Sequence, residues 1–510
     1  MASRRILLDG EHLTLEQVLA VARSAVPVGL APAARRRMQK SRDWVERAVR
    51  QRAVVYGVTT GFGAFQNVPI EREKMRELQR NLILSHCAGV GDPLPEEVVR
   101  AMLLLRANAL AHGFSGIRVS TVDRLVEMLN KHVHPVVPSQ GSVGASGDLA
   151  PLSHVAAVLI GEGEALYEGR KMSGDHAMRA ARIRPVTLEA KEGIALNNGT
   201  QAMTAIGALC LCDAEVLADA ADVAAAMTLE AVKGKSQAFA PEVQAVRPHP
   251  GQRLSARNIR TMIQGSTLID RVDRDTGDKV QDSYSLRCVP QVHGASRDAI
   301  AYVRRVLGVE INSSTDNPLI FPGAEHAFSA GNFHGQPVAL AMDFLGLAVA
   351  ELGSISERRT AKLMDRHHNY GLPPFLASNG GVQSGMMIAQ YTAAALVSEN
   401  KVLIHPASGD SIPTSANQED HVSMGTIAAR QARMVLENAR RVVAIELLCA
   451  AEALDHRKER PGEKSRKVLA LVRKAVPRQE GDRQLSAEIE SVASLIAGGR
   501  LTKILHEKPR

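Results

Sequence analysis

Apolar residues recur at helical spacing over four long stretches, and this pattern dominates the chain. Residues 200–232 form an alanine-rich run without proline, and residues 336–359, 385–404 and 425–454 follow the same pattern. Apolar side chains in residues 336–359 cover almost the whole circumference of the expected helix, so other helices must surround it. The pattern predicts a mostly α protein with an extended central bundle of long antiparallel helices.

Strand patterns are few and short, for example at residues 52–58 and 166–171. Glycine and small polar residues cluster in five loops beside the helices, at residues 56–63, 140–147, 197–200, 329–336 and 408–420. Such loops on a rigid scaffold are where functional sites tend to lie. No change of composition marks a clean boundary, so we expect one unit over residues 1–510. Within it we expect a smaller, loop-rich N-terminal part over about residues 1–199 and the long-helix bundle over about residues 200–510.

Composition narrows the classes of protein. Apolar residues make up 45% of the 510 residues and charged residues 23%, which is typical of a globular protein. The net charge of +8 is spread along the chain and aromatic residues are only 3%, so we expect no nucleic-acid partner. The N-terminal residues show no signal-peptide core and no apolar stretch reads as a membrane span, so we expect no membrane. Five cysteines without a CxxC pair favour a reducing cytoplasm.

Common cofactor and nucleophile motifs are missing from the sequence. There is no GxxxxGK[ST] phosphate loop, no GxGxxG after a strand, no HExxH and no GxSxG. The sequence therefore predicts neither a metal nor a nucleotide cofactor.

The run GSVGASGD at residues 141–148 has two interpretations. The simpler one is a flexible turn in which Asp148 caps the helix that follows. In the other, Ala145, Ser146 and Gly147 form a strained turn, and the Gly147 amide nitrogen reaches the Ala145 carbonyl carbon, an approach that only glycine permits. Ring closure and loss of the Ser146 hydroxyl as water would leave a methylidene on an imidazolone ring, an electrophile made from the chain itself.

With these residues and seven further motifs, the sequence resembles the aromatic amino acid ammonia-lyase family over nearly its full length. The motifs stand in family order: YGVTTGFG (56–63), LSHCAGVG (84–91), GSVGASGDLAPLSH (141–154), NNGTQAM (197–203), QDSYSLRCVPQVHGA (281–295), NSSTDNPL (312–319), SAGNFHGQP (329–337) and DSIPTSANQEDHVSMG (410–425). The family forms a methylideneimidazolone from Ala-Ser-Gly. The resemblance implies the same group from Ala145, Ser146 and Gly147, with Ser146 becoming dehydroalanine, and no external cofactor.

The resemblance implies non-oxidative deamination by covalent attack of the substrate amine on the carbon derived from Ser146. It makes Tyr56 the candidate base, gives Asn198 a hydrogen bond to the imidazolone oxygen or substrate carboxylate, and makes Phe333 a wall that orients the electrophile. Without it, Tyr56 would be a core tyrosine ending a strand. Asn198 would be a helix N-cap paired with Gln201.

Gln281, Tyr284 and Arg287 are spaced three apart, which places them on one face of a helical turn. The resemblance makes Arg287 the clamp for the substrate carboxylate, since a guanidinium fork grips both oxygens. It places Tyr284 beside the electrophile and lets Gln281 support the ring or the substrate. Active sites of the family draw loops from neighbouring subunits, so the resemblance also implies a homotetramer with shared sites and an inactive monomer.

Substrate choice depends on His86 and on the pair Gln418 and Glu419. His86, which alone would be a helix-end histidine, faces the substrate ring in the family, and members specific for histidine or tyrosine tend to carry His there. Glu419, otherwise an acid in the first turn of a helix entered at residues 420–421, stands where relatives acting on phenylalanine or tyrosine tend to have an amide. A carboxylate accepts a charge-assisted hydrogen bond from imidazole N–H, which a phenyl ring lacks. The sequence therefore favours L-histidine as substrate, with trans-urocanate and ammonia as products, the first step of histidine degradation.

Two alternatives stay open. The chain could deaminate tyrosine or phenylalanine, or be an aminomutase with the same electrophile; Glu419 argues against these. It could also be a non-catalytic helical scaffold, against which the intact set of Tyr56, Ser146, Tyr284 and Arg287 argues.

Overall fold

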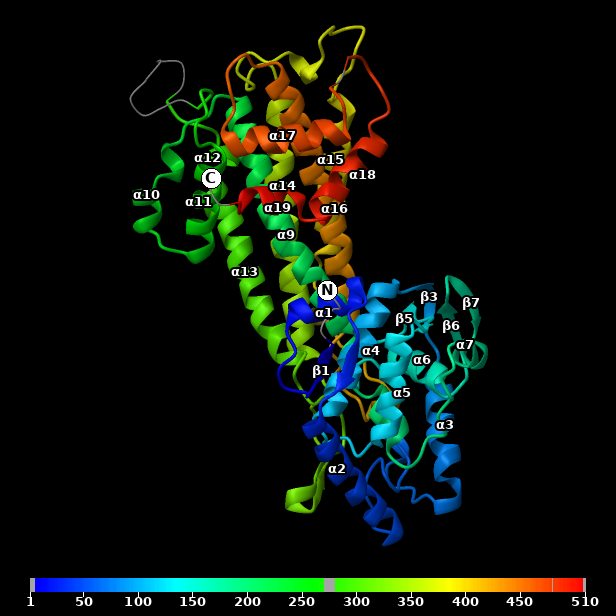
Figure 1. Cartoon of the computed structure of the whole chain (residues 1–510). Helices are drawn as coiled ribbons and strands as arrows, with labels where there is room; N and C mark the ends of the chain where they lie inside the picture. Colours follow the sequence, from blue (N-terminus) through cyan, green and yellow to red (C-terminus); the bar gives the residue numbers. More distant parts are fainter. Residues whose placement is uncertain (1–4, 270–279, 479, 508–510) are drawn as a thin grey trace. The chain divides into compact units, whose positions relative to one another are not determined.

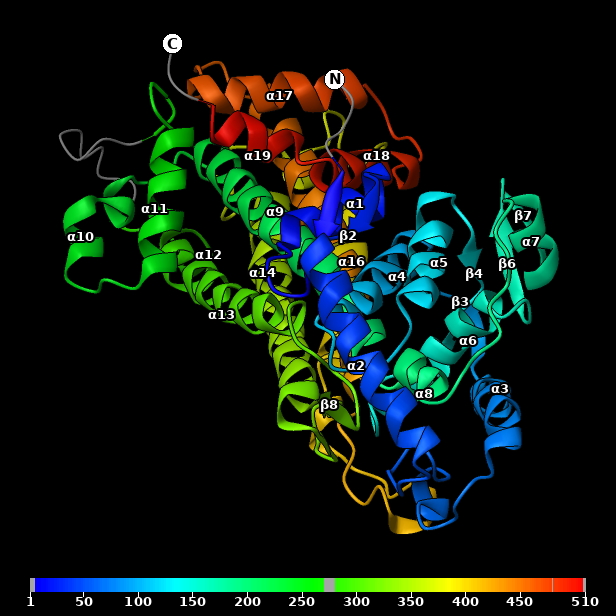
Figure 2. The same cartoon turned by 60° about the horizontal axis from the view of Figure 1, so that its bottom comes forward.

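The computed structural model describes residues 5–269, 280–478 and 480–507, and helices dominate them, so the predicted mostly α class is confirmed. The chain divides into two compact units. Unit 1 consists of Met1–Leu209, Arg304–Asp343 and Pro406–Arg430, and unit 2 consists of Cys210–Val303, Phe344–His405 and Gln431–Arg510. Figures 1 and 2 show the labelled elements along the chain.

The four long helices predicted from the apolar pattern are confirmed within a few residues of their expected ends. They are α9 (Gln201–Ala231), α14 (Gln336–Met364), α15 (Met387–Leu403) and α16 (Gly425–Asp455). Proline is tolerated in the first turn of α14, because a first-turn N–H has no helical partner in any case. The boundary between the units falls within α9, α14 and α16.

A fifth long helix, α13 (Val289–Glu310), has a weaker apolar signal because glycines interrupt it. Gly294 has a packing reason: a Cβ there would lie 2.4 Å from the backbone nitrogen of Gln252. Glycine therefore lets α11 (Pro250–Met262) and the part of α13 that belongs to unit 2 approach backbone to backbone.

Unit 1 contains every strand that the structure describes. Its remaining elements are β1 (Ile6–Leu8), α1 (Leu15–Ser24), β2 (Val28–Leu30), α2 (Pro32–Arg50), α3 (Met75–His86), β3 (Val90–Pro93), α4 (Glu96–Ala111), α5 (Val119–Asn130), β4 (His134–Pro135), β5 (Pro138–Gln140), α6 (Leu149–Leu159), β6 (Glu164–Tyr167), β7 (Arg170–Ser173), α7 (Gly174–Ala180), α8 (Glu192–Asn197), β8 (Leu319–Phe321) and β9 (His326–Phe328). The strands form small sheets, β1-β2 parallel and β3-β5, β4-β6-β7 and β8-β9 antiparallel. Helix α4 is buried along almost its whole length and packs against α1 and α5, and Figure 1 shows α4 and α5 side by side.

Both predicted strands need correction. Residues 52–58 form turns rather than a strand, because Thr59 satisfies their backbone locally: its Oγ1 accepts from Val55 N at 2.9 Å and donates to the Ala53 carbonyl at 2.6 Å. Residues 166–171 are not one strand but the hairpin between β6 and β7, which turns through Glu168 and Gly169 at positive φ.

Unit 2 contains no β-strand among its described residues. Besides its parts of the long helices it contains α10 (Pro241–Ala245), α11, α12 (Tyr284–Arg287), α17 (Glu463–Ala475), α18 (Ser486–Ala497) and α19 (Arg500–Leu505). Buried ion pairs link its long helices. Arg359 of α14 donates to both carboxylate oxygens of Glu446 of α16, at 2.5 and 2.7 Å, and both side chains are fully buried. Removing one partner would leave an uncompensated buried charge, so such pairs fix the helix register.

Helices α9 and α14 are long and apolar enough to cross a bilayer. However, 83% of the most apolar window of α9 and 67% of that of α14 is buried within the structure. Core helices of soluble proteins have the same composition for the same reason, because neither kind of helix faces water.

Candidate active site

A pocket of about 970 Å³ in unit 1 gathers most of the residues predicted from sequence. Its walls come from the loop after α2, the last turn of α3, the start of α6, the end of α8 and two loops near residues 330 and 417. The predicted residues that line it are Tyr56, His86, Ser146, Asn198, Phe333, Gln418 and Glu419. Segments far apart in the chain therefore meet at one cavity.

The Ala145-Ser146-Gly147 turn requires a glycine at its third position. Gly147 has φ +70°, and a Cβ on it would lie 2.2 Å from the Gly199 carbonyl oxygen, so only glycine fits. Ala145 is buried among Val422 and Met424, whereas Ser146 lines the pocket. A buried small residue, a pocket-lining serine and an obligatory glycine fit a methylideneimidazolone at this place.

Two side chains contact Ser146 directly. Ser146 Oγ donates to Glu419 Oε1 at 3.0 Å, and Asn198 Nδ2 donates to the Ser146 carbonyl oxygen at 3.0 Å. The other carboxylate oxygen of Glu419 accepts from Thr414 Oγ1 at 2.8 Å. The amide of Asn198 can stabilise negative charge on the Ser146 carbonyl, and Glu419 brings a carboxylate to the hydroxyl that would be lost.

The simpler interpretation, in which the side chains of Asp148 and Asn198 cap the N-terminus of the helix that follows each of them, is wrong. Asp148 occupies the N-cap position of α6, but its side chain makes no capping bond. It is fully buried and accepts instead from Met203 N at 2.8 Å, Ser142 Oγ at 2.9 Å and Thr426 Oγ1, and burial raises its pKa. Asn198 follows the last turn of α8 as its C-cap, and no capping box with a neighbouring glutamine forms.

Burial shifts the pKa of two pocket residues in opposite directions. It raises the pKa of Tyr56, and the charge of Glu419 raises it further, while the backbone N–H of Gly63 opposes both. It lowers the pKa of His86, which ends α3 as expected, so this imidazole is neutral near pH 7. Within unit 1, the net upward shift of the Tyr56 pKa disfavours a tyrosinate.

Glu419 does not stand in the first turn of a helix, so that interpretation is wrong. A short 3-10 turn at Ser415–Asn417 precedes it, and α16 begins only at Gly425. Thr414 and Glu419 instead pair in an isolated β-bridge. The carboxylate is therefore held by a compact loop rather than by a helix dipole.

The remaining predicted residues, Gln281, Tyr284 and Arg287, lie in unit 2 and outside the pocket of unit 1. Only Tyr284 and Arg287 share a helix, the short α12; Gln281 precedes it, so the expected single helical face is only partly right. Tyr284 is 71% exposed, and the Arg287 guanidinium carbon lies 4.5 Å from its ring centroid. Arg287 Nε is buried without a hydrogen-bond partner among the described residues.

Sequence reasoning missed the apolar part of the pocket and the polar Asn197. The apolar lining residues include Phe62, Phe65, Leu78, Leu82, Leu149 and Ile194. Phe62 and Phe65 belong to the same glycine-containing loop as Tyr56, and that shared loop is the signal that could have found them. Gln66 Nε2 of this loop donates to Gln418 Oε1 at 3.3 Å, which ties the tyrosine loop to the glutamate loop.

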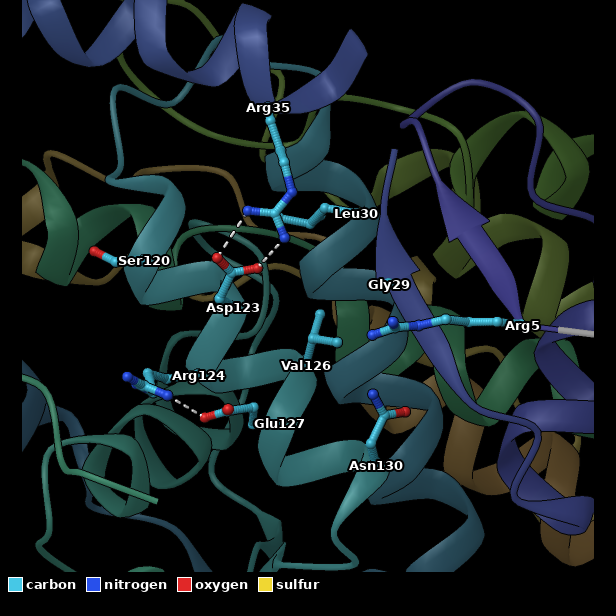
Figure 3. A pocket seen from close by; sticks show the side chains of 10 residues that line it. All are labelled: Arg5, Gly29, Leu30, Arg35, Ser120, Asp123, Arg124, Val126, Glu127 and Asn130. Carbon is cyan, nitrogen blue, oxygen red and sulfur yellow. Dashed lines mark hydrogen bonds and ion pairs between the residues drawn. The ribbon is translucent and has the colours of Figure 1, made fainter. Parts of the chain in front are cut away.

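A second pocket of unit 1, of about 290 Å³, lies between β2, α2 and α5 and suits a ligand less well (Figure 3). Its charged groups satisfy one another, since Arg35 grips both oxygens of Asp123 at 2.9 and 2.5 Å and Arg124 pairs with Glu127. Among the described residues, no group of three or more His, Cys, Asp or Glu side chains is arranged to hold a metal ion.

A helical fold with a pocket-lining Ala-Ser-Gly turn defines a class of carbon–nitrogen lyases. Residues 13–474 match the sequence profile of the aromatic amino acid lyase family, and the chain belongs to this family. A histidine ammonia-lyase of Caldanaerobacter subterraneus subsp. tengcongensis is 56% identical over 506 residues, which cover 99% of each chain.

Solved structures agree with this family. The crystal structure of histidine ammonia-lyase from Trypanosoma cruzi matches with a TM-score of 0.91 and 43% identity, over 98% of this chain and 95% of the other. Tyrosine aminomutase from Streptomyces globisporus matches with a TM-score of 0.94 and 39% identity, over 99% of this chain and 100% of the other. The chain is therefore similar along its whole length to enzymes of the family.

Proposed function

We propose that this chain is a histidine ammonia-lyase, which converts L-histidine to trans-urocanate and ammonia with a methylideneimidazolone formed from Ala145, Ser146 and Gly147. Relatives named histidine ammonia-lyase, 52% to 57% identical over nearly the full chain, support the substrate. The observation that carries the proposal is the placement of Glu419 at Ser146 Oγ, 3.0 Å away. The group, once formed, supplies an electrophilic carbon that takes up the substrate amine.

Some pocket residues of unit 1 bind the ring of the substrate, and another acts on its reacting carbons. Glu419, anchored by Thr414 through one oxygen, offers the other to an imidazole N–H when the Ser146 hydroxyl has gone. His86 is neutral and lines the same cavity, so it adds a hydrogen-bonding group without a second charge. Tyr56 is the base that removes the β-proton.

Among the described residues, no arginine or lysine lines this pocket to bind the substrate carboxylate, and we propose that a second copy of the chain supplies this group. Arg287 has a buried Nε without a partner among the described residues and lies next to the exposed Tyr284, as expected of a residue that awaits an acceptor. Unit 2 also exposes apolar side chains on α14 and α15, for example Phe344, Leu347 and Tyr391, which are 43%, 50% and 63% exposed. Such a surface supports self-association, and we propose a homotetramer that is soluble and cytoplasmic.

Incubation with L-histidine, with urocanate followed by its ultraviolet absorbance, tests the proposal directly. L-Tyrosine and L-phenylalanine serve as control substrates. We expect urocanate from the wild-type chain and, for Glu419→Gln, a loss of kcat/KM on L-histidine of about 100-fold, since a charge-assisted hydrogen bond is lost. Affinity for glycine, which carries the backbone groups alone, should change little; an equal loss for glycine would contradict the assigned role of Glu419.

The structural similarity to tyrosine aminomutase supports one alternative function, an aminomutase that uses the same electrophile. An aminomutase would return ammonia to the neighbouring carbon and yield a β-amino acid instead of an acrylate. Product analysis by chromatography distinguishes the two outcomes. A carboxylate at position 419 favours an imidazole over the phenyl ring of phenylalanine, because the phenyl ring has no N–H or O–H to donate.

A further inference from the structure

The buried side chain of Arg106 does not line the pocket, yet it holds the turn that carries Asn198. Arg106 belongs to α4 and is 1% exposed. Its Nε donates to the Ala195 carbonyl at 2.9 Å and Nη2 donates to the same oxygen. Its Nη1 donates to Gln201 Oε1 and to the Thr315 carbonyl, both at 2.9 Å. One guanidinium therefore ties together both ends of the turn.

Asn198 stands in the middle of this turn, and its neighbour packs on the guanidinium. A Cβ on Gly199 would lie 2.4 Å from Arg106 Nη1, so the chain passes directly over the guanidinium. The Gly199 carbonyl accepts from Asp148 N at 2.7 Å, and Asn198 Nδ2 reaches the Ser146 carbonyl at 3.0 Å. The orientation of the Asn198 amide thus depends on the conformation of the turn, which the hydrogen bonds of Arg106 hold in place.

Arg106 is a buried cation whose hydrogen bonds all go to neutral acceptors. Burial lowers the pKa of Arg106 to about 10, with the charge of Asp316 opposing, so it stays charged near pH 7. Asp316 itself is paired with Lys191 at 2.8 Å. A buried charge without a hydrogen-bonded carboxylate is costly. Arginine suits this position because the N–H groups of its planar guanidinium can donate to three separate acceptors at once, which other side chains cannot do.

We propose that Arg106 is a positioning residue for the deamination: its guanidinium fork holds the Asn198 amide on the Ser146 carbonyl oxygen without touching the substrate. This inference rests on the proposed function. A lysine would keep the positive charge but could not bridge Ala195, Gln201 and Thr315 at once. Arg106→Lys should therefore lower turnover (kcat), and it should do so because Asn198 is displaced.

A kinetic comparison with a matched arginine tests the proposal. For Arg106→Lys we expect kcat to fall about 100-fold with KM within about threefold, because a small displacement of a catalytic group is costly. The control is Arg100→Lys, since Arg100 is a buried arginine of the same helix that donates to the Val21 and Leu129 carbonyls. We expect Arg100→Lys to lower the thermal unfolding midpoint but to leave kcat within about threefold of wild type.

A double-mutant cycle shows whether Arg106 acts through Asn198. In an Asn198→Ala background, Arg106→Lys should lower kcat by less than about threefold, because the group it positions is gone. Intact mass should show every variant two waters lighter than its sequence, so the effect lies in turnover and not in maturation. Additive losses, an equal kcat loss in Arg100→Lys, or an Arg106→Lys chain that retains its waters would each overturn the proposal.

A second variant covers the case in which Arg106→Lys does not fold. Gln201→Met removes one acceptor of the guanidinium and leaves the cation in place. We expect a smaller loss of kcat, about tenfold, that again vanishes in the Asn198→Ala background. Failure of the proposed function would look different, because the wild-type chain would then form no urocanate at all.

Discussion

The two halves of the predicted site lie in the pocket of unit 1 and on helix α12 of unit 2. They differ in whether their side chains already have hydrogen-bond partners. In the pocket, Asn198 and Glu419 each form a hydrogen bond of 3.0 Å with Ser146. On α12, Tyr284 is 71% exposed and Arg287 Nε has no partner among the described residues. This difference supports the proposal that one chain supplies the electrophile and the ring-binding group of a site, whereas a second chain supplies the carboxylate clamp.

The largest effect should come from Ser146→Ala, which removes the only hydroxyl of the Ala-Ser-Gly turn. We expect no detectable urocanate, because the electrophile cannot form without that hydroxyl. The fold should survive, since the variant loses one side-chain hydrogen bond, to Glu419, of a half-buried serine. Urocanate formation, intact mass and the thermal unfolding midpoint are the measurements.

Ser142→Ala is a useful control for Ser146→Ala. Ser142 lies in the same loop and donates to Asp148 Oδ1 at 2.9 Å, so its loss perturbs the loop without removing the reacting hydroxyl. We expect this control to lose two waters as the wild type does. A Ser146→Ala chain that still forms urocanate would remove the chain-derived electrophile from the account.

The fold and the pocket could be predicted from sequence to different degrees. The helices α9, α14, α15 and α16 follow from uninterrupted apolar patterns at helical spacing. Residues 52–58 could not be read correctly, because a threonine side chain, rather than a neighbouring strand, satisfies their backbone.

The site shows the same limit. Motif resemblance found seven of the pocket-lining residues. Local rules, however, misread the side chains of Asp148 and Asn198 as N-caps, because both are short polar residues beside a helix. Their actual partners are distant in sequence: Asp148 binds Thr426, and Asn198 binds Ser146. The buried role of Arg106 could not be predicted from the sequence, because a single arginine in an apolar helix is expected at the surface until its hydrogen-bond acceptors are known.

Mixing two inactive variants tests whether the two halves of the site come from different chains. Ser146→Ala should lack the electrophile, and Arg287→Ala should lack the clamp, so each alone should be inactive or nearly so. If a site takes Ser146 from one chain and Arg287 from another, random co-assembly should restore about one quarter of the sites. Urocanate formation by the co-expressed chains, normalised to wild type, measures this fraction.

The control for this experiment is mixing Ser146→Ala with Glu419→Ala. Ser146 and Glu419 contact each other within unit 1, so a hybrid cannot separate them and no site should be restored. Recovery in this control, or none in the Arg287 mixture, would mean that the two halves of the site are not divided between chains as proposed.

The smallest effect should be a shift of the pH–rate profile in Glu419→Gln. The ionised fraction of Tyr56 grows with pH, so if Tyr56 is the base, the rate should rise toward alkaline pH. The negative charge of Glu419 is one cause that raises the pKa of Tyr56, after burial. Removing that charge lowers the pKa of Tyr56, and the rising limb should move to lower pH by less than about one unit.

His86 does not mask the shift, because burial lowers its pKa away from the alkaline range. The residual activity of Tyr56→Phe, measured over the same range, reports the titration of the substrate amine alone. A limb that moves to higher pH, or a limb that persists unchanged in Tyr56→Phe, would assign the removal of the β-proton to a group other than Tyr56.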